Sequence, residues 1–195
     1  MRRWRRLLAA VIMAAAGSGG GLLAAAPASA DTPAPYFQIV IRSRNLPYEC
    51  VQGDVGGPLG SSVTQHYCDP TGTQRDQLWL PISLGGDQWK FQNAASQLCL
   101  EARFGAVSGQ PVALWVCAST ESNTRWQWGG PRSGSPPFPN NGPIPSRVSG
   151  STGFCLDVPG DSTAIGLQLQ LYSCNSSEAQ FFYVIRFVGG VAIFP

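Results

Sequence analysis

The stretch CLDVPGDSTAIGLQLQLYSC runs from Cys155 to Cys174 and decides how the whole chain is interpreted. An aspartate follows the first cysteine by two positions, and a tyrosine precedes the second cysteine by two. Alternating apolar residues lead into the tyrosine, which is the period of a half-buried β-strand. A Gly/Pro/Asp turn lies before that strand. What the pattern means depends on whether it recurs.

The pattern recurs twice more, because the six cysteines form three evenly spaced pairs. The separations within the pairs are 18, 18 and 19 residues, and successive first cysteines are 49 and 56 residues apart. Six cysteines allow 15 pairings, and the simplest of them joins the cysteines within each repeat. The pairs are Cys50 and Cys68, Cys99 and Cys117, and Cys155 and Cys174.

The N-terminal segment 1–30 has the form of a secretory signal peptide. Four arginines precede a short apolar run, and the segment ends in Ala28-Ser29-Ala30. The apolar run is too short to span a bilayer, so we expect no membrane span. Its removal would leave 31–195 as an extracellular, secreted chain, in which an even number of cysteines indicates disulfides.

The charge of the chain gives no indication of a nucleic-acid partner. Four of the 13 Lys and Arg residues belong to the signal segment, which leaves nine basic residues against 11 acidic ones. No basic patch therefore remains in 31–195. The apparent basicity belongs to the targeting segment.

Each repeat offers about four short strands, which makes twelve in all. Three such repeats predict a closed threefold β architecture, because closure removes edge strands. We expect the repeats at about 36–85, 86–130 and 144–195, with a proline-rich surface insertion at 131–143. The expected shared core includes Leu100, Leu114, Leu156, Leu171, Trp79, Trp126 and Phe182.

A Gln-x-aromatic triplet follows each cysteine pair, in full or in part. The triplets are Gln77-Leu78-Trp79, Thr124-Arg125-Trp126 and Gln180-Phe181-Phe182. With the Cys-Leu-Asp and Leu-aromatic-x-Cys patterns, the chain resembles the ricin-type β-trefoil lectins and the family-13 carbohydrate-binding modules of bacterial glycosidases. The resemblance implies an all-β, β-trefoil fold with three four-stranded repeats and one disulfide in each.

The resemblance also implies a shallow sugar site in each repeat, and the third repeat matches best. A carboxylate accepts hydrogen bonds from neighbouring sugar hydroxyls, and an aromatic face covers the apolar face of the ring. Asp157 stands at the carboxylate position and Tyr172 at the stacking position. Gln170 and Gln180 are the polar residues beside them. Ala179 replaces the asparagine with which the family completes the site.

The other two repeats depart further from the family pattern. In the second repeat, Glu101, Trp115 and Asn123 are weaker candidates, because glutamate is longer than aspartate and one residue is inserted after Cys117. In the first repeat, the corresponding residues Gln52, His66 and Asp76 are expected to keep the fold without binding sugar.

We therefore expect a secreted, non-catalytic, lectin-like module that binds galactose-, xylose- or arabinose-containing glycans weakly, mainly through the third repeat. The alternative is a β-trefoil that has lost sugar binding and acts as a protein-binding or inhibitor module. The eroded first and second repeats favour the alternative, and the third favours the lectin.

The sequence contains no motif that indicates catalysis or a cofactor site. His66 is the single histidine, and no nucleophile motif accompanies it. The cysteines are assigned to disulfides, and no glycine-rich phosphate loop opens a helix. We expect no enzyme activity, no metal and no cofactor.

Overall fold

The computed structural model describes residues 36–41, 47–118, 120–128, 141–150, 153–188 and 191–193. Within these residues the regular structure is β-strands and short 3-10 turns, and no helix among them is long and apolar enough to cross a membrane. The expected signal peptide, 1–30, and most of the expected insertion, 131–143, lie outside the described residues.

Strands lie around each of the three cysteine pairs. The first repeat holds β1 (Phe37–Ile41), β2 (Glu49–Gly53), β3 (Val63–Tyr67) and β4 (Trp79–Gly85). The second holds β5 (Gln88–Asn93), β6 (Cys99–Ala102), β7 (Gln110–Trp115) and β8 (Trp126–Gln127). The third holds β9 (Asn141–Gly142), β10 (Phe154–Asp157), β11 (Gln170–Ser173) and β12 (Phe182–Val188). A further strand, β13 (Val191–Ile193), pairs with β12. β9 lies wholly within the range expected for the insertion, 131–143, and before the range expected for the third repeat, 144–195.

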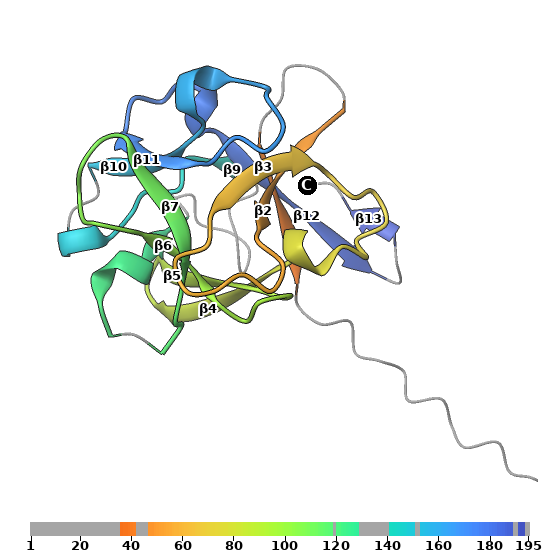
Figure 1. Ribbon diagram of the computed structural model, residues 1–195, viewed down its shortest axis with the longest axis horizontal. Coiled ribbons are helices and arrows are strands. Elements are labelled where there is room, and N and C mark those ends of the chain that lie inside the picture. Colours follow the sequence, from red (N-terminus) through yellow and green to blue (C-terminus); the bar gives the residue numbers. More distant parts are fainter. Residues whose placement is uncertain are drawn as a thin grey trace, which may run out of the picture. The chain divides into compact units, whose positions relative to one another are not determined.

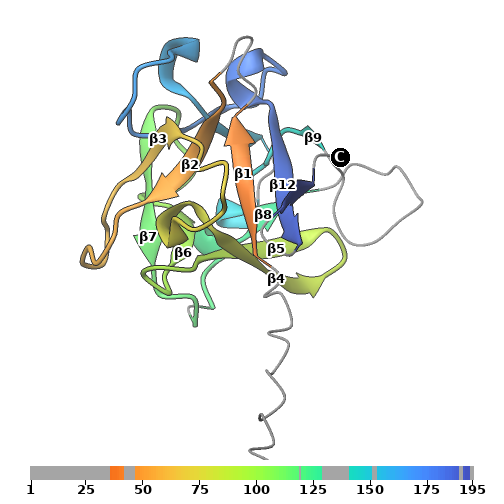
Figure 2. The ribbon, with the colours of Figure 1, turned by 90° about the vertical axis from the view of Figure 1, so that its right-hand side faces the viewer.

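Antiparallel pairing joins the first repeat to the last. β1 pairs with β12 along its whole length, and Figure 2 shows these two strands side by side. β1 also pairs with β4, and β4 pairs with β5, which links the first and second repeats. The middle strands of each repeat form the hairpins β2–β3, β6–β7 and β10–β11, and β7 pairs with β11 (Figure 1). The threefold β architecture expected from the repeats is therefore present.

The core is built from the apolar face of these strands. All seven residues that the sequence assigned to the core belong to one buried cluster. Trp79 and Trp126 are fully buried, and each donates its indole N–H to a backbone carbonyl, of Val51 and Leu100 respectively, at 2.9 Å. This bond satisfies the polar end of an otherwise apolar side chain. Phe182 takes the same position in the third repeat without such a donor.

The three disulfides join the cysteines within each repeat, as the spacing predicted. Each connects the first strand of a hairpin to the residue one or two places past its second strand, with Cα–Cα distances of 4.9 to 5.1 Å. No described cysteine is free. The bonds are Cys50–Cys68, Cys99–Cys117 and Cys155–Cys174.

A glycine in each hairpin turn docks that turn onto the hairpin of the next repeat. Each of these glycines has a left-handed backbone, with φ values of 86°, 83° and 81°, which favours glycine over other residues. Its N–H donates to the carbonyl that directly precedes the aromatic position of the neighbouring hairpin. The three bonds are Gly60 to Leu114 (2.8 Å), Gly109 to Leu171 (2.8 Å) and Gly166 to Gln65 (2.9 Å).

Candidate functional site

The hairpin β10–β11 brings the predicted residues of the third repeat onto one face. In its register Cys155 lies opposite Tyr172, and Asp157 lies opposite Gln170. Because side chains alternate along a strand, these residues share the outer face, while the fully buried Leu171 faces the core. The Tyr172 side chain is 42% exposed, whereas Asp157 is only 4% exposed. The site therefore has an accessible ring beside a recessed carboxylate.

The carboxylate of Asp157 is held by two side-chain amides. Gln170 Nε2 donates to Oδ1 at 2.7 Å, and Gln180 Nε2 donates to Oδ2 at 3.0 Å. Burial raises the pKa of Asp157 above its ordinary value, the two amide bonds act in the opposite direction, and the negative Asp161 raises it further. Each oxygen keeps a further lone pair that a hydroxyl could use.

Gln180 is buried at the end of the 3-10 turn η5 (Glu178–Gln180), and its amide is fully used. Besides the bond to Asp157, its Nε2 donates to the carbonyl of Ser173 at 3.0 Å. Its Oε1 accepts the N–H of Asn175 at 2.9 Å. Both amide hydrogens therefore serve the protein, and Gln180 lies behind the carboxylate.

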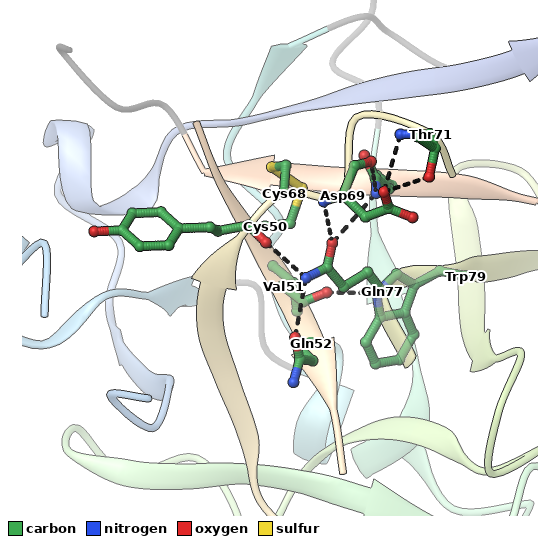
Figure 3. The surroundings of a disulfide bond; sticks show 10 residues. Cys50, Val51, Gln52, Cys68, Asp69, Thr71, Gln77 and Trp79 are labelled. Atoms are coloured by element: carbon green, nitrogen blue, oxygen red, sulfur yellow. Dashed lines mark hydrogen bonds between the residues drawn. A yellow bond between two sulfur atoms is a disulfide. The ribbon is translucent and has the colours of Figure 1, made fainter. Parts of the chain in front are cut away.

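Gln77 repeats this arrangement in the first repeat, as Figure 3 shows. It ends the 3-10 turn η1 (Arg75–Gln77), and its Nε2 donates to Gln52 Oε1 at 3.0 Å and to the carbonyl of Tyr67 at 2.7 Å. Its Oε1 accepts the N–H of Asp69 at 2.7 Å. The glutamine of the Gln-x-aromatic motif thus fixes the residue at the carboxylate position by hydrogen bonds, and we call this glutamine the clamp. The sequence could have indicated this role, because the glutamine of the motif is kept in a repeat whose carboxylate position holds the uncharged Gln52.

The second repeat also brings its three candidate residues together. Cys99 lies opposite Trp115 and Glu101 lies opposite Ala113, so Glu101 and Trp115 share the outer face of β6–β7. Asn123, in the 3-10 turn η2 (Ser122–Thr124), donates its Nδ2 to Glu101 Oε1. The residue inserted after Cys117 therefore does not displace the amide. Thr124 stands where the other repeats have the glutamine clamp.

Glu101 is as enclosed as its counterpart Asp157, but fewer of its carboxylate oxygens have a hydrogen-bond partner. It is 4% exposed, and among the described residues neither Glu101 Oε2 nor Asn123 Oδ1 has a hydrogen-bond partner. Burial raises the pKa of Glu101, the positive Arg103 lowers it in part, and Glu121 raises it. Arg103 extends to the first repeat, where Nη1 donates to the carbonyl of Gly60 at 3.0 Å.

The first repeat has no carboxylate at the position that Asp157 holds in the third repeat. Gln52 takes the carboxylate position and receives the clamp from Gln77. His66, opposite Cys50, packs edge-on against the ring of Tyr67. The backbone carbonyl of Asp76 accepts a bond from Asn93 Nδ2 at 2.7 Å. Among the described residues no group of three or more His, Cys, Asp or Glu side chains is arranged to hold a metal ion.

Residues 37–133 match the model of the ricin-type beta-trefoil lectin domain. The chain therefore carries a ricin-type β-trefoil lectin domain. No curated protein matches the chain significantly in sequence.

Solved structures similar to this chain have the same fold. The designed threefold-symmetric protein ThreeFoil has a TM-score of 0.65 at 19% identity, over 78% of this chain and 99% of its own. The C-half of the earthworm R-type lectin, solved with GalNAc, has a TM-score of 0.57 at 14% identity, over 77% and 97%. The ricin B-like lectin of Macrolepiota procera, solved with lactose, has a TM-score of 0.56 at 16% identity, over 78% and 96%. At these identities the likeness establishes the β-trefoil fold.

Proposed function

We propose that this protein is a non-catalytic carbohydrate-binding module whose main site is in the third repeat. The observation that carries the proposal is the pairing of a recessed carboxylate, Asp157, with an exposed ring, Tyr172, on one face of β10–β11. A sugar has an apolar face that an aromatic ring can cover and hydroxyls that a carboxylate can accept. The match of residues 37–133 to the lectin domain supports the carbohydrate-binding class, and the choice of the third repeat rests on the geometry of Asp157 and Tyr172.

The residues divide into ligands and a positioning residue. Asp157 accepts sugar hydroxyls, Tyr172 stacks against the ring, and Gln170 completes the hydroxyl network. Gln180 fixes Asp157, because both of its amide hydrogens are already donated within the protein. Ala179 supplies no amide, so binding should be weak, on the order of millimolar or about −4 kcal/mol for a simple sugar.

NMR titration with galactose, N-acetylgalactosamine, lactose, xylose and arabinose tests the proposal. We expect shifts around Tyr172 and Asp157 with at least one of these classes of sugar. Asp157→Ala should abolish detectable binding, and Tyr172→Ala should nearly do so. His66→Ala, at the equivalent position of the first repeat, is the matched control and should leave binding unchanged. Absence of shifts with every glycan would instead favour a sugar-binding-deficient, protein-binding module.

The second repeat is a second candidate site for the same function. Its support is the pair of buried acceptor atoms without partners, Glu101 Oε2 and Asn123 Oδ1, which sugar hydroxyls could satisfy. In the same titration, shifts centred on Trp115 that disappear in Glu101→Ala would move the main site to this repeat.

We also propose that the protein is secreted after cleavage of 1–30. The support is the sequence of that segment together with three disulfides, which persist in oxidising compartments. Mass spectrometry of protein recovered from the medium should give Asp31 as the first residue. Retention of the full-length chain in the cell would contradict the proposal.

A further inference from the structure

Three cationic side chains from distant parts of the sequence meet on one face of the sheet. Trp126 pairs antiparallel with β5 on one side and with residues 145–147 on the other. One step before this residue, Arg125 therefore lies opposite Lys90 of β5 and opposite Arg147, whose N–H donates to the carbonyl of Arg125 at 2.8 Å. Side chains directly opposite across antiparallel strands share a face and lie close together. We call these three residues the cationic row.

The cationic row lies on the face that points away from the core. Trp126 belongs to the buried core, and side chains alternate along extended backbone, so Arg125 points to the opposite face. Phe91 of β5 also belongs to the core, which places its neighbour Lys90 on the same outer face as Arg125. Lys90 is only 6% exposed, whereas Arg125 and Arg147 are half-buried. The two arginines therefore form the accessible part of the row.

The like charges in the row act on one another. Burial lowers the pKa of Lys90, and the positive charge of Arg125 lowers it further. Lys90 Nζ donates to the carbonyl of Cys117 at 2.6 Å, and Arg125 Nη2 donates to the carbonyl of Thr120 at 2.8 Å. A neutral carbonyl satisfies a donor without cancelling its charge. Like charges directly opposite each other therefore destabilise this face of the sheet.

The carboxylates beside the row do not satisfy all of its donors. Asp87 Oδ1 lies 3.5 Å from Arg147 Nη2, and Asp87 Oδ2 accepts a bond from Gln127 Nε2. Glu121, directly after Thr120, is exposed. Among the described residues, the Nε atoms of Arg125 and Arg147 are buried and have no hydrogen-bond partner. A buried donor without a partner is costly, so both arginines lack an acceptor.

We propose that an oxyanion of the sulfate or phosphate class binds across Arg125 and Arg147. Its oxygens accept the two Nε–H groups, and its charge offsets the repulsion along the row. The planar fork of arginine matches such oxygens with paired bonds. Because the Nε atoms are enclosed, a small rotation of the guanidinium groups accompanies binding. The site uses none of the residues assigned to the sugar sites, so the inference is independent of the proposed function.

NMR titration of isotope-labelled protein with sodium sulfate and with sodium phosphate tests the inference, with sodium chloride at equal ionic strength as the reference. We expect saturable shifts of the Nε–H signals of Arg125 and Arg147 with the oxyanions and none with chloride. Arg125→Gln and Arg147→Gln should each weaken binding about tenfold, the effect of a lost hydrogen bond to a charged group. Arg75→Gln is the matched control and should leave the affinity unchanged, because Arg75 also donates to a backbone carbonyl, that of Ala94, but stands outside the row.

Asp87→Asn tests the site in the opposite direction. It removes the carboxylate that competes for Arg147, so the affinity for sulfate should rise about two- to fivefold, the range of an exposed ion pair. This variant keeps both arginines, and its result stands even if a glutamine variant fails to fold, which the thermal midpoint would show.

Galactose 6-sulfate, compared with galactose and with inorganic sulfate, distinguishes the two sources of the anion. If it shifts the Arg125 and Arg147 signals at lower concentration than inorganic sulfate does, the ligand is a sulfate ester. Equal affinity supports the site with the free ion as its ligand. Shifts that do not saturate, that chloride also produces, or that survive in both glutamine variants would overturn the inference and leave the proposed sugar binding standing. An unchanged affinity in Asp87→Asn would also overturn it.

Discussion

Gln180 Nε2 lies 3.0 Å from Asp157 Oδ2, and this bond ties the Gln-x-aromatic motif to the carboxylate of the candidate site. Gln77 makes the equivalent bond to Gln52, a residue that has no charge, at the same distance. A contact that is kept where no carboxylate exists serves the fold first. We therefore expect the motif to affect sugar binding indirectly, by fixing the residue at the carboxylate position.

Removal of either glutamine amide should therefore lower stability. Gln180→Ala would leave the carbonyl of Ser173 and the N–H of Asn175 without their partner, and Gln77→Ala would do the same to Tyr67 and Asp69. Each change should reduce the free energy of unfolding by roughly 1–3 kcal/mol, as measured by chemical denaturation.

Thr124→Ala is the matched control at the same position of the second repeat. Its hydroxyl makes one long bond, 3.4 Å, to the carbonyl of Glu121, so the loss should stay below about 1 kcal/mol. If the free energy of unfolding fell equally in all three variants, the loss would come from packing and not from the hydrogen bonds of the glutamine.

The sequence predicted the repeats, the disulfides and the core because these depend on spacing along the chain. The positions of Cys155, Leu156 and Asp157 on alternate faces of a strand follow from the period of two residues. The direction in which Gln180 points its amide does not follow from spacing, because it depends on where the turn η5 places the side chain. The docking of Ser108 against Ser173 joins residues 65 apart and likewise has no local signal.

Asp69 provides a pH-dependent contribution to stability. Its carboxylate accepts bonds from Thr71 (N–H at 3.0 Å and hydroxyl), Thr73 (N–H and hydroxyl) and Gln74 (N–H at 2.8 Å). Burial acts to raise the pKa of Asp69, but these bonds outweigh it and hold the pKa well below the ordinary value of 3.8. A carboxyl group whose pKa is lowered by folding stabilises the folded state at pH values above its ordinary pKa. This stabilisation is lost as the pH falls below the ordinary pKa.

Asp69→Asn should therefore lower the free energy of unfolding by roughly 2–3 kcal/mol at pH 7, since bonds to a charged acceptor are the stronger kind. The difference in the free energy of unfolding between the variant and the wild type should decrease as the pH falls below 3.8. Denaturant titrations at pH 7, 4 and 2.5 would measure it. The exposed Asp54→Asn is the control, and its effect should stay within about 0.5 kcal/mol. A gap that does not change with pH would contradict the role assigned to the charge.

Asp157 should make sugar binding sensitive to acid. Burial raises the pKa of this carboxyl, so it takes up its proton above the ordinary value of 3.8. The protonated form loses the charge that strengthens its bonds to sugar hydroxyls. Affinity measured by NMR should fall as the pH drops from 7, with the decline beginning above 3.8.

The same group acts on stability with the opposite sign. A raised pKa favours the folded state at pH values below the ordinary one, and this contribution is lost as the pH rises through the folded value. As the pH is lowered, the affinity for sugar should therefore fall, while protonation of Asp157 should not destabilise the folded protein. An affinity that stays constant down to pH 4 would mean that the sugar does not depend on this charge.

An asparagine at position 179 should restore the amide that the third repeat lacks. The equivalent residue of the second repeat, Asn123, donates to Glu101 from the same place in its 3-10 turn. Ala179→Asn should tighten sugar binding by roughly 1 kcal/mol, about fivefold, which is one net hydrogen bond. Ala179 is 6% exposed, so Ala179→Ser serves as the control for added polarity at a buried position.

Gln170 already occupies Oδ1 of Asp157, whereas the second repeat has Ala113 at the paired position. The double variant Ala179→Asn/Gln170→Ala would therefore reproduce the second-repeat arrangement around an aspartate. If the amide arm limits affinity, this variant should bind at least as tightly as Ala179→Asn alone. If Gln170 is itself a ligand, the double variant should bind more weakly than the single one, and isothermal titration with the best sugar probe would distinguish the two results.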